Sequence, residues 1–240
     1  MAVAKAIDLS ERKTELRNKV KDILPEGGNL DLCFTCGSCV AGCPATGLEG
    51  LDPRKFLRMV VLGLDEEVLS TPWVWMCTIC DRCKYACPMK VDIPRLVYEV
   101  RAMWPRDKRP TGIRKSCDFH VKTGGAMGVS KEDWTFVVND VLEEFRQESG
   151  WGNLRAPMDK EGAYFCLNQN SREPVTEPEE MVPLWRILHL AGADWTYPSE
   201  MWAGENYCMF LADDESWQYT IRTLAKKVDD LRCKVLINTE

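Results

Sequence analysis

The chain has 240 residues, of which 45% are hydrophobic and 28% charged, and its formal net charge is −6 at pH 7. This acidic balance argues against nucleic acid as the main ligand, because phosphate binding requires a basic surface. No apolar run approaches the ~20 residues of a membrane span, and the N-terminus lacks the long apolar region of a signal peptide. We therefore expect a cytoplasmic protein with no membrane span of its own, which meets a membrane only through partners.

The first predicted element is an amphipathic helix near the N-terminus. Ser10 can cap this helix, and Leu16, Val20 and Leu24 lie on one face. The segment PEGGN, residues 25–29, ends it. A run of four cysteines, CFTCGSCVAGCP at residues 33–44, comes next.

Two further helices follow, separated by a second cysteine run. Asp52 and Pro53 have the character of an N-cap and a first helical residue, and the apolar residues after them repeat at helical spacing. The second run, CTICDRCKYACP, occupies residues 77–88. Asp92 and Pro94 then begin a helix that we expect to continue through Arg101. The first hundred residues are therefore predicted to be mostly helical, with cysteine loops between the helices.

Twelve cysteines in one chain indicate either a secreted disulfide scaffold or metal binding. The absence of an export signal and a chain long enough to build a core both argue against the scaffold. Eight of the cysteines also fall into the two runs of identical spacing. Metal binding is therefore the favoured interpretation.

Both runs have the spacing Cys-x2-Cys-x2-Cys-x3-Cys-Pro. This is the spacing of bacterial two-cluster ferredoxins, in which the fourth cysteine ligates the other cluster. We therefore expect two 4Fe–4S clusters, one held by Cys33, Cys36, Cys39 and Cys87, the other by Cys77, Cys80, Cys83 and Cys43. The alternative is a pair of zinc sites, but zinc ribbons use two cysteine pairs separated by a longer loop.

The segment between the two runs is much longer than in a small ferredoxin, and it has a helical pattern. Together with the second run it reads LDPRKFLRMVVLGLDEEVL…WVWMCTICDRCKYACPMKVDIPRLV. This sequence resembles the helical ferredoxin module of heterodisulfide reductases, in their C-subunit and at the start of their D-subunit. Similar modules occur in succinate dehydrogenase. The resemblance covers residues 30–104 and implies an all-α domain with two clusters.

The second half changes character. Residues 123–128, TGGAMG, are predicted to form a flexible joint, and Ser130 caps a helix that runs to about residue 145. Strands are predicted at 163–168, 193–199 and 233–240, with helices at 179–190, interrupted near Pro183, and at 215–231. The alternation of strand and helix predicts a small parallel sheet.

The second half also resembles heterodisulfide reductases, more weakly, in the region that joins the ferredoxin module to the cysteine-rich CCG domains of D-type subunits. It departs from that pattern because it contains no Cys-Cys pair. Cys117, Cys166, Cys208 and Cys233 are scattered singly, and we expect them to be small buried hydrophobic residues. Neither of the two histidines lies in a ligand motif.

The predicted fold is α + α/β. Residues 1–106 form the all-α helical ferredoxin domain, 107–130 a linker, and 131–240 a small or incomplete α/β domain resembling a CCG domain. Whether the protein continues beyond Glu240, through a selenocysteine or as a separate polypeptide, is left open.

The predicted function is electron transfer within an iron–sulfur oxidoreductase complex, with no catalytic residue in this chain. The expected partners are a flavoprotein or a CCG-domain subunit, and a membrane cytochrome or quinone-linked subunit is a further candidate. The alternative is a catalytic subunit with thiol–disulfide chemistry, truncated before its active-site cysteine or selenocysteine.

Overall fold

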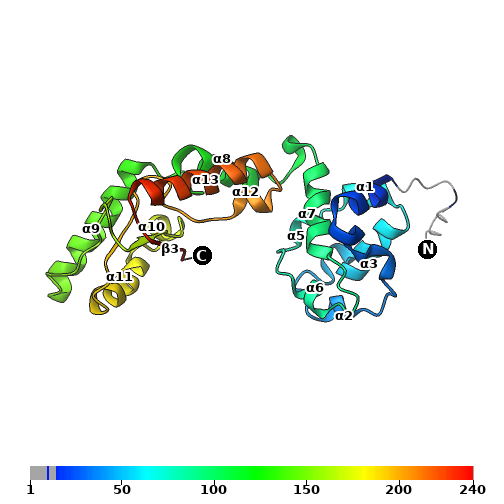
Figure 1. Cartoon of the computed structure of the whole chain (residues 1–240), viewed down its shortest axis with the longest axis horizontal. Coiled ribbons are helices and arrows are strands. Elements are labelled where there is room, and N and C mark those ends of the chain that lie inside the picture. Colours follow the sequence, from blue (N-terminus) through cyan, green and yellow to red (C-terminus); the bar gives the residue numbers. More distant parts are fainter. Residues whose placement is uncertain (1–9, 11–14, 240) are drawn as a thin grey trace. The chain divides into compact units, whose positions relative to one another are not determined.

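The computed structural model describes residue 10 and residues 15–239 (Figure 1). The chain divides into two compact units, Met1–Pro110 and Thr111–Glu240. The described residues are mostly helical and include one small parallel sheet. This agrees with the predicted balance of a helical first part and an α/β second part.

The first unit contains helices only, within the residues described. They are α1 (Glu15–Ile23), η1 (Pro25–Leu32), α2 (Ser38–Ala41), η2 (Leu48–Gly50), α3 (Pro53–Val61), α4 (Asp65–Ser70), α5 (Trp73–Met76), α6 (Arg82–Ala86), α7 (Ile93–Met103) and η3 (Arg106–Lys108). The short helices α4 and α5 were not predicted. The start of α1 expected at Ser10 involves residues 11–14, which lie outside the described residues.

The predicted caps of α3 and α7 are confirmed. The Asp52 carboxylate accepts the backbone N–H of Lys55 at 2.8 Å, and that of Asp92 accepts the N–H of Arg95 at 3.2 Å. Each cap satisfies one of the amide groups that a helix leaves unpaired in its first turn. Each cap begins the long helix that follows a cysteine run, α3 after the first run and α7 after the second.

The core of the first unit lies between α1, α3, α4, α5 and α7. Phe56, Val60, Trp73 and Leu96 are among its fully buried side chains. The Trp73 indole N–H donates to the Ala45 carbonyl at 2.9 Å. This bond connects the helix before the second cysteine run to the loop after the first.

The second unit combines helices with three short strands. Its elements are α8 (Thr111–Thr123), α9 (Lys131–Ser149), β1 (Phe165–Leu167), α10 (Glu173–Thr176), η4 (Pro178–Glu180), α11 (Met181–Leu190), β2 (Trp195–Thr196), α12 (Tyr207–Phe210), α13 (Asp214–Asp230) and β3 (Val235–Ile237). The Ser130 cap is confirmed, because its side chain accepts the Asp133 N–H at 3.0 Å.

Two details of this unit differ from the prediction. The segment 107–130, expected as a linker, is mostly α8, which packs against α12 and α13 and therefore belongs to the second unit. Pro183 does not interrupt α11, because it is the third residue of that helix, where a missing N–H breaks no intrahelical bond.

The TGGAMG segment is packed rather than free. A Cβ added at Gly124 would lie 2.6 Å from the backbone nitrogen of Met201, and one at Gly125 would lie 2.8 Å from the Trp202 ring. Ala126 is buried. The glycines therefore allow close backbone approach, and the prediction of a flexible joint is wrong.

The three strands form a parallel sheet in the order β2-β1-β3, as the strand–helix alternation predicted. One side of this unit is closed by an aromatic core around α9 and α11. The Trp134 ring stacks on Trp202 with centroids 4.4 Å apart, and its indole N–H donates to the Pro198 carbonyl at 3.1 Å. These contacts hold the loop after β2 against α9.

Candidate metal centre

The two cysteine runs adopt the same local backbone. In the first, Thr35 and Gly37 have positive φ angles of 64° and 87°. At the equivalent positions of the second, Ile79 and Asp81 have φ angles of 52° and 62°. A β-branched residue such as Ile79 rarely adopts this conformation, which costs about 1–3 kcal/mol and is found mostly at functional sites. The conformation lets three cysteines of one short loop surround a common space.

Each loop borders a pocket that the fourth cysteine of the other run completes. One pocket is lined by Cys33, Cys36, Cys39 and Cys87, and the second by Cys43, Cys77, Cys80 and Cys83. The short helices α2 and α6, which carry the third cysteine of each run, contact each other. The eight thiols therefore line two pockets in two groups of four.

The two pockets are neighbours. The Ile93 side chain, at the start of α7, lies in the wall of both. The electrostatic neighbours of Cys83 include Cys77 and Cys43 of its own set and Cys39 of the other. Groups bound in the two pockets would therefore be neighbours that share the Ile93 side chain as part of their walls.

Burial makes bare thiolates unfavourable in both pockets. Burial, together with the smaller effect of the neighbouring cysteines, raises the pKa of Cys39 to about 11 and that of Cys83 to about 12. Thiolates in such places need a bound metal to neutralise them. Backbone amides assist, because the N–H of Ile79 lies 3.5 Å from the Cys77 sulfur and that of Val91 lies 3.4 Å from the Cys87 sulfur.

The second cysteine of each run is different, because it lies at the surface. Cys36 and Cys80 are exposed. A hydrogen bond between the Cys36 sulfur and the Ser38 hydroxyl lowers the pKa of Cys36, and the backbone N–H of Arg82 lowers that of Cys80. Each pocket therefore has one edge that solvent or a partner can reach.

Arg101 is a functional candidate that the sequence interpretation missed. Its guanidinium is buried, donates to the carbonyls of Val74 and Cys77, and lies over the Trp75 ring at 5.2 Å. Burial lowers the pKa of Arg101 to about 10, and the neighbouring Cys77 opposes that shift. Its position four residues after Val97, on the buried face of α7, is the signal that could have identified it.

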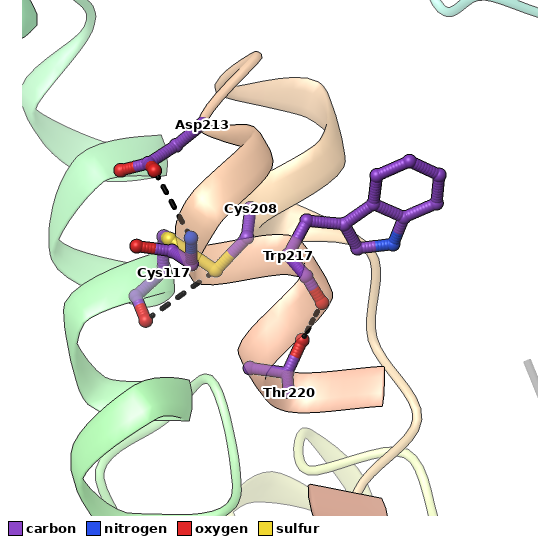
Figure 2. The surroundings of a disulfide bond; sticks show 6 residues. Cys117, Cys208, Asp213, Trp217 and Thr220 are labelled. Atoms are coloured by element: carbon purple, nitrogen blue, oxygen red, sulfur yellow. Dashed lines mark hydrogen bonds between the residues drawn. A yellow bond between two sulfur atoms is a disulfide. The ribbon is translucent and has the colours of Figure 1, made fainter. Parts of the chain in front are cut away.

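The sequence predicts that the four remaining cysteines are isolated buried residues, and the structure shows that this is wrong for some of them. Cys117 of α8 and Cys208 of α12 form a disulfide that joins positions 91 residues apart (Figure 2). Cys166 is a buried thiol, as predicted, but it contacts Cys233, which is only partly buried. Single cysteines so distant in sequence carry no pairing signal, because only the tertiary fold brings them together.

Comparison with known proteins agrees with this geometry. Residues 29–91 match the family model of the 4Fe-4S dicluster domain. The chain is 32% identical over 129 residues to the C-subunit of the H(2):CoB-CoM heterodisulfide,ferredoxin reductase of Methanothermobacter marburgensis, which covers 53% of this chain and 65% of that protein. It is 33% identical over 171 residues to the C2-subunit of the H(2)/formate:CoB-CoM heterodisulfide,ferredoxin reductase of Methanococcus maripaludis, covering 71% of this chain and 82% of that protein.

A third relative aligns with a larger share of the chain than these two. The iron-sulfur C-subunit of the CoB--CoM heterodisulfide reductase of Methanopyrus kandleri is 26% identical over 184 residues, which covers 75% of this chain and 86% of that protein. The fold and the site thus define an iron–sulfur protein with a dicluster domain. Within that class, the chain belongs to the family of heterodisulfide reductase C-subunits.

Two further observations concern the length of the match and the hydropathy of the helices. The match spans 65% of the length of the Methanothermobacter relative. In the part of the chain that the structure describes, no helix has both the length and the apolar character needed to cross a membrane.

Proposed function

We propose that this chain is an electron relay in a heterodisulfide reductase-like complex, holding two 4Fe–4S clusters in the first unit. The observation that carries the proposal is the crossed arrangement of the two cysteine runs around adjacent pockets. Each cluster, when bound, accepts and donates one electron at a time. The residues of the chain bind the clusters, set their surroundings and hold them next to each other.

The ligand sets we propose are those predicted from the spacing, with Cys87 and Cys43 exchanged between the runs. Each pocket is lined by three cysteines of one run, at intervals of three residues, and by the fourth cysteine of the other run. Zinc ribbons instead use two cysteine pairs separated by a longer loop. The crossed sets of four therefore support clusters rather than single zinc ions.

The exposed edges suggest where electrons enter and leave. Phe34 is 61% exposed beside the first pocket, and Tyr85, 75% exposed, lies on the helix that carries Cys83. Cys36 and Cys80 are exposed at the same edges. We propose that other subunits of the complex, a flavoprotein or a CCG-domain subunit, dock at these two edges, and that the complex is cytoplasmic.

The test is metal analysis and EPR spectroscopy of the full chain, purified without oxygen. The proposal predicts about eight irons and no stoichiometric zinc per chain, and a signal from two interacting clusters after reduction. Zinc in place of iron would refute it. An additional signal that depends on an added thiol would favour the catalytic alternative, a subunit with thiol–disulfide chemistry.

A further inference from the structure

The second unit contains a pocket that the electron-relay function does not use. Its wall includes His120 of α8, Glu205 in the loop before α12, and Trp217, Ile221 and Leu224 of α13. The pocket is partly open to solvent. It lies away from the cysteine runs in sequence, and every residue of its lining belongs to the second unit.

The pocket lies at the carboxyl ends of the parallel strands. Asn168 follows β1 and Asn238 follows β3, and both approach the loop that carries Gly204. A Cβ at Gly204 would lie 2.1 Å from the Asn238 Oδ1 atom and 3.0 Å from the Asn168 Nδ2 atom. In the order β2-β1-β3, the chain reverses direction across the sheet between β1 and β3. Open parallel sheets bind ligands at such a point.

His120 lies in the wall of this pocket and has a buried ring nitrogen without a hydrogen-bond partner. The residue is 3% exposed, and among the described residues its Nδ1 atom has no hydrogen-bond partner. A hydrogen bond joins the ring to the backbone of Ala203, which leaves Nε2 as the donor to that carbonyl. Burial lowers the pKa of His120, so the ring is neutral near pH 7. Its Nδ1 lone pair is then an acceptor.

Glu205 presents a second acceptor, which carries negative charge. The residue is 5% exposed. One carboxylate oxygen accepts the backbone N–H of Ser171, whereas Oε2 has no partner among the described residues. A buried carboxylate oxygen without a hydrogen bond is strongly unfavourable, and a cationic donor is the group that relieves it.

The opposite wall, on α13, is mainly apolar and aromatic, although it includes Thr220 and the Trp217 indole N–H, which has no partner among the described residues. Ile221 and Leu224 lie one turn apart on α13, and Trp217 lies one turn before Ile221. An aromatic ring favours a nearby cation, and aliphatic side chains favour an alkyl chain. Two acceptors on one wall and a mainly apolar wall opposite them favour a ligand that has a cationic donor at one end and an alkyl chain at the other.

We propose that this pocket binds a primary ammonium group on a short apolar stem. The ammonium donates to the Glu205 Oε2 and His120 Nδ1 atoms, and the stem packs against Trp217, Ile221 and Leu224. The ligand is a free alkylamine or the side chain of a lysine, which share this chemistry.

The disulfide holds the two polar walls in place. Cys117 lies one turn before His120 on α8, and Cys208 lies three residues after Glu205. Figure 2 shows the bond joining the two helices, with the Trp217 indole directed away from it. Because the bond is buried within the unit, it orders the site without being part of the pocket wall.

The experiment is a titration of the full chain, purified without oxygen with its clusters and labelled with nitrogen-15 in histidine. The chain has two histidines, so the two imidazole rings can be told apart by substitution. With n-butylammonium as the probe, we expect a saturable shift of the His120 Nδ1 resonance in the millimolar range. The His189 resonances should not change.

Two matched variants identify the charge responsible. Glu205→Gln keeps the oxygen that Ser171 needs but removes the negative charge, and it should weaken binding by at least about 10-fold. Glu200→Gln removes a carboxylate that is 57% exposed, and binding should remain unchanged. The proposal is overturned if His120 shows no saturable shift, if both variants bind like the wild type, or if n-butanol binds as tightly as n-butylammonium.

Two further probes complete the assignment. Binding of Zn²⁺ at His120 without binding of n-butylammonium would make this a metal site and also overturn the proposal. Nα-acetyl-lysine methylamide tests the source of the ammonium. Binding equal to that of n-butylammonium supports a lysine side chain as the ligand, whereas weaker binding supports a free amine.

Discussion

The two units of this chain use cysteine in opposite ways. In the first unit, eight cysteines lie in two short runs, and each run folds three of its thiols around one pocket by local backbone conformation. In the second unit, four cysteines lie far apart, and the fold itself brings Cys117 to Cys208 and Cys166 to Cys233. The spacing of cysteines in the sequence therefore indicates which of them lie together in the first unit, whereas it does not indicate which of them pair in the second.

The largest expected effect comes from the cysteine that crosses between the runs. Cys87→Ser should remove the cluster of the first run, and Cys43→Ser that of the second, with iron falling from about eight to about four per chain. After reduction, Cys87→Ser and Cys36→Ser should give the same EPR spectrum, because both lose the first-run cluster. Cys43→Ser and Cys80→Ser should likewise share a spectrum, because both lose the second-run cluster. If Cys87→Ser instead matched Cys80→Ser, each run would hold its own cluster.

The disulfide should matter for stability and not for the clusters. Replacing Cys117 and Cys208 together by Ser should lower the free energy of unfolding of the second unit by about 2–4 kcal/mol. Without the cross-link, the unfolded chain gains conformational entropy and becomes more favourable relative to the folded state. Thermal melting measures this change, and iron content should be unaffected. Cys233→Ser, which removes a partly buried thiol, should cost less than about 1 kcal/mol. A loss of iron in the double variant would contradict the separation of roles.

Arg101 should make the two clusters unequal. Reduction adds negative charge, which the buried guanidinium beside Cys77 stabilises. In Arg101→Met, the reduction potential of the second-run cluster should fall relative to that of the first-run cluster by ~59 mV. This corresponds to a tenfold shift of the one-electron equilibrium toward the first-run cluster. EPR-monitored redox titration measures both potentials. Arg95→Met, whose side chain is 49% exposed, serves as the control and should leave them unchanged. Equal shifts of both potentials in Arg101→Met would argue against a local effect.

The smallest effect is a pH dependence that belongs to the second unit. Burial lowers the pKa of His120, which Glu205 and the Ala203 backbone partly oppose. The unfolded chain therefore takes up a proton first as pH falls below about 6.5, and the folded chain loses stability until its own lower pKa is reached. Melting temperature should therefore fall with acidity across that window.

The control for this prediction uses the other histidine. His120→Gln preserves a donor near the position of Nε2 and should flatten the melting profile below about pH 6.5. His189→Asn should keep the slope of the wild type. An unchanged slope in His120→Gln would assign the acid sensitivity to other groups.

Much of the helical framework could be predicted from the sequence, because its signals are local. Asp52 and Asp92 were identified as caps, and each accepts the amide three residues later. The parallel sheet was predicted from the order of its elements. The prediction failed at 107–130, where glycines indicated a joint. The close packing of Gly124 and Gly125 on Met201 and Trp202 cannot be read from spacing.

The sequence by itself determined which cysteines could act together in the first unit, because three thiols at intervals of three residues are confined to one loop. It also determined the family to which the chain belongs. The tertiary structure alone decided that Cys117 pairs with Cys208, that Arg101 lies beside Cys77, and that His120 and Glu205 face one pocket. The physical reason is distance along the chain, since local backbone geometry cannot encode contacts that depend on how whole elements pack.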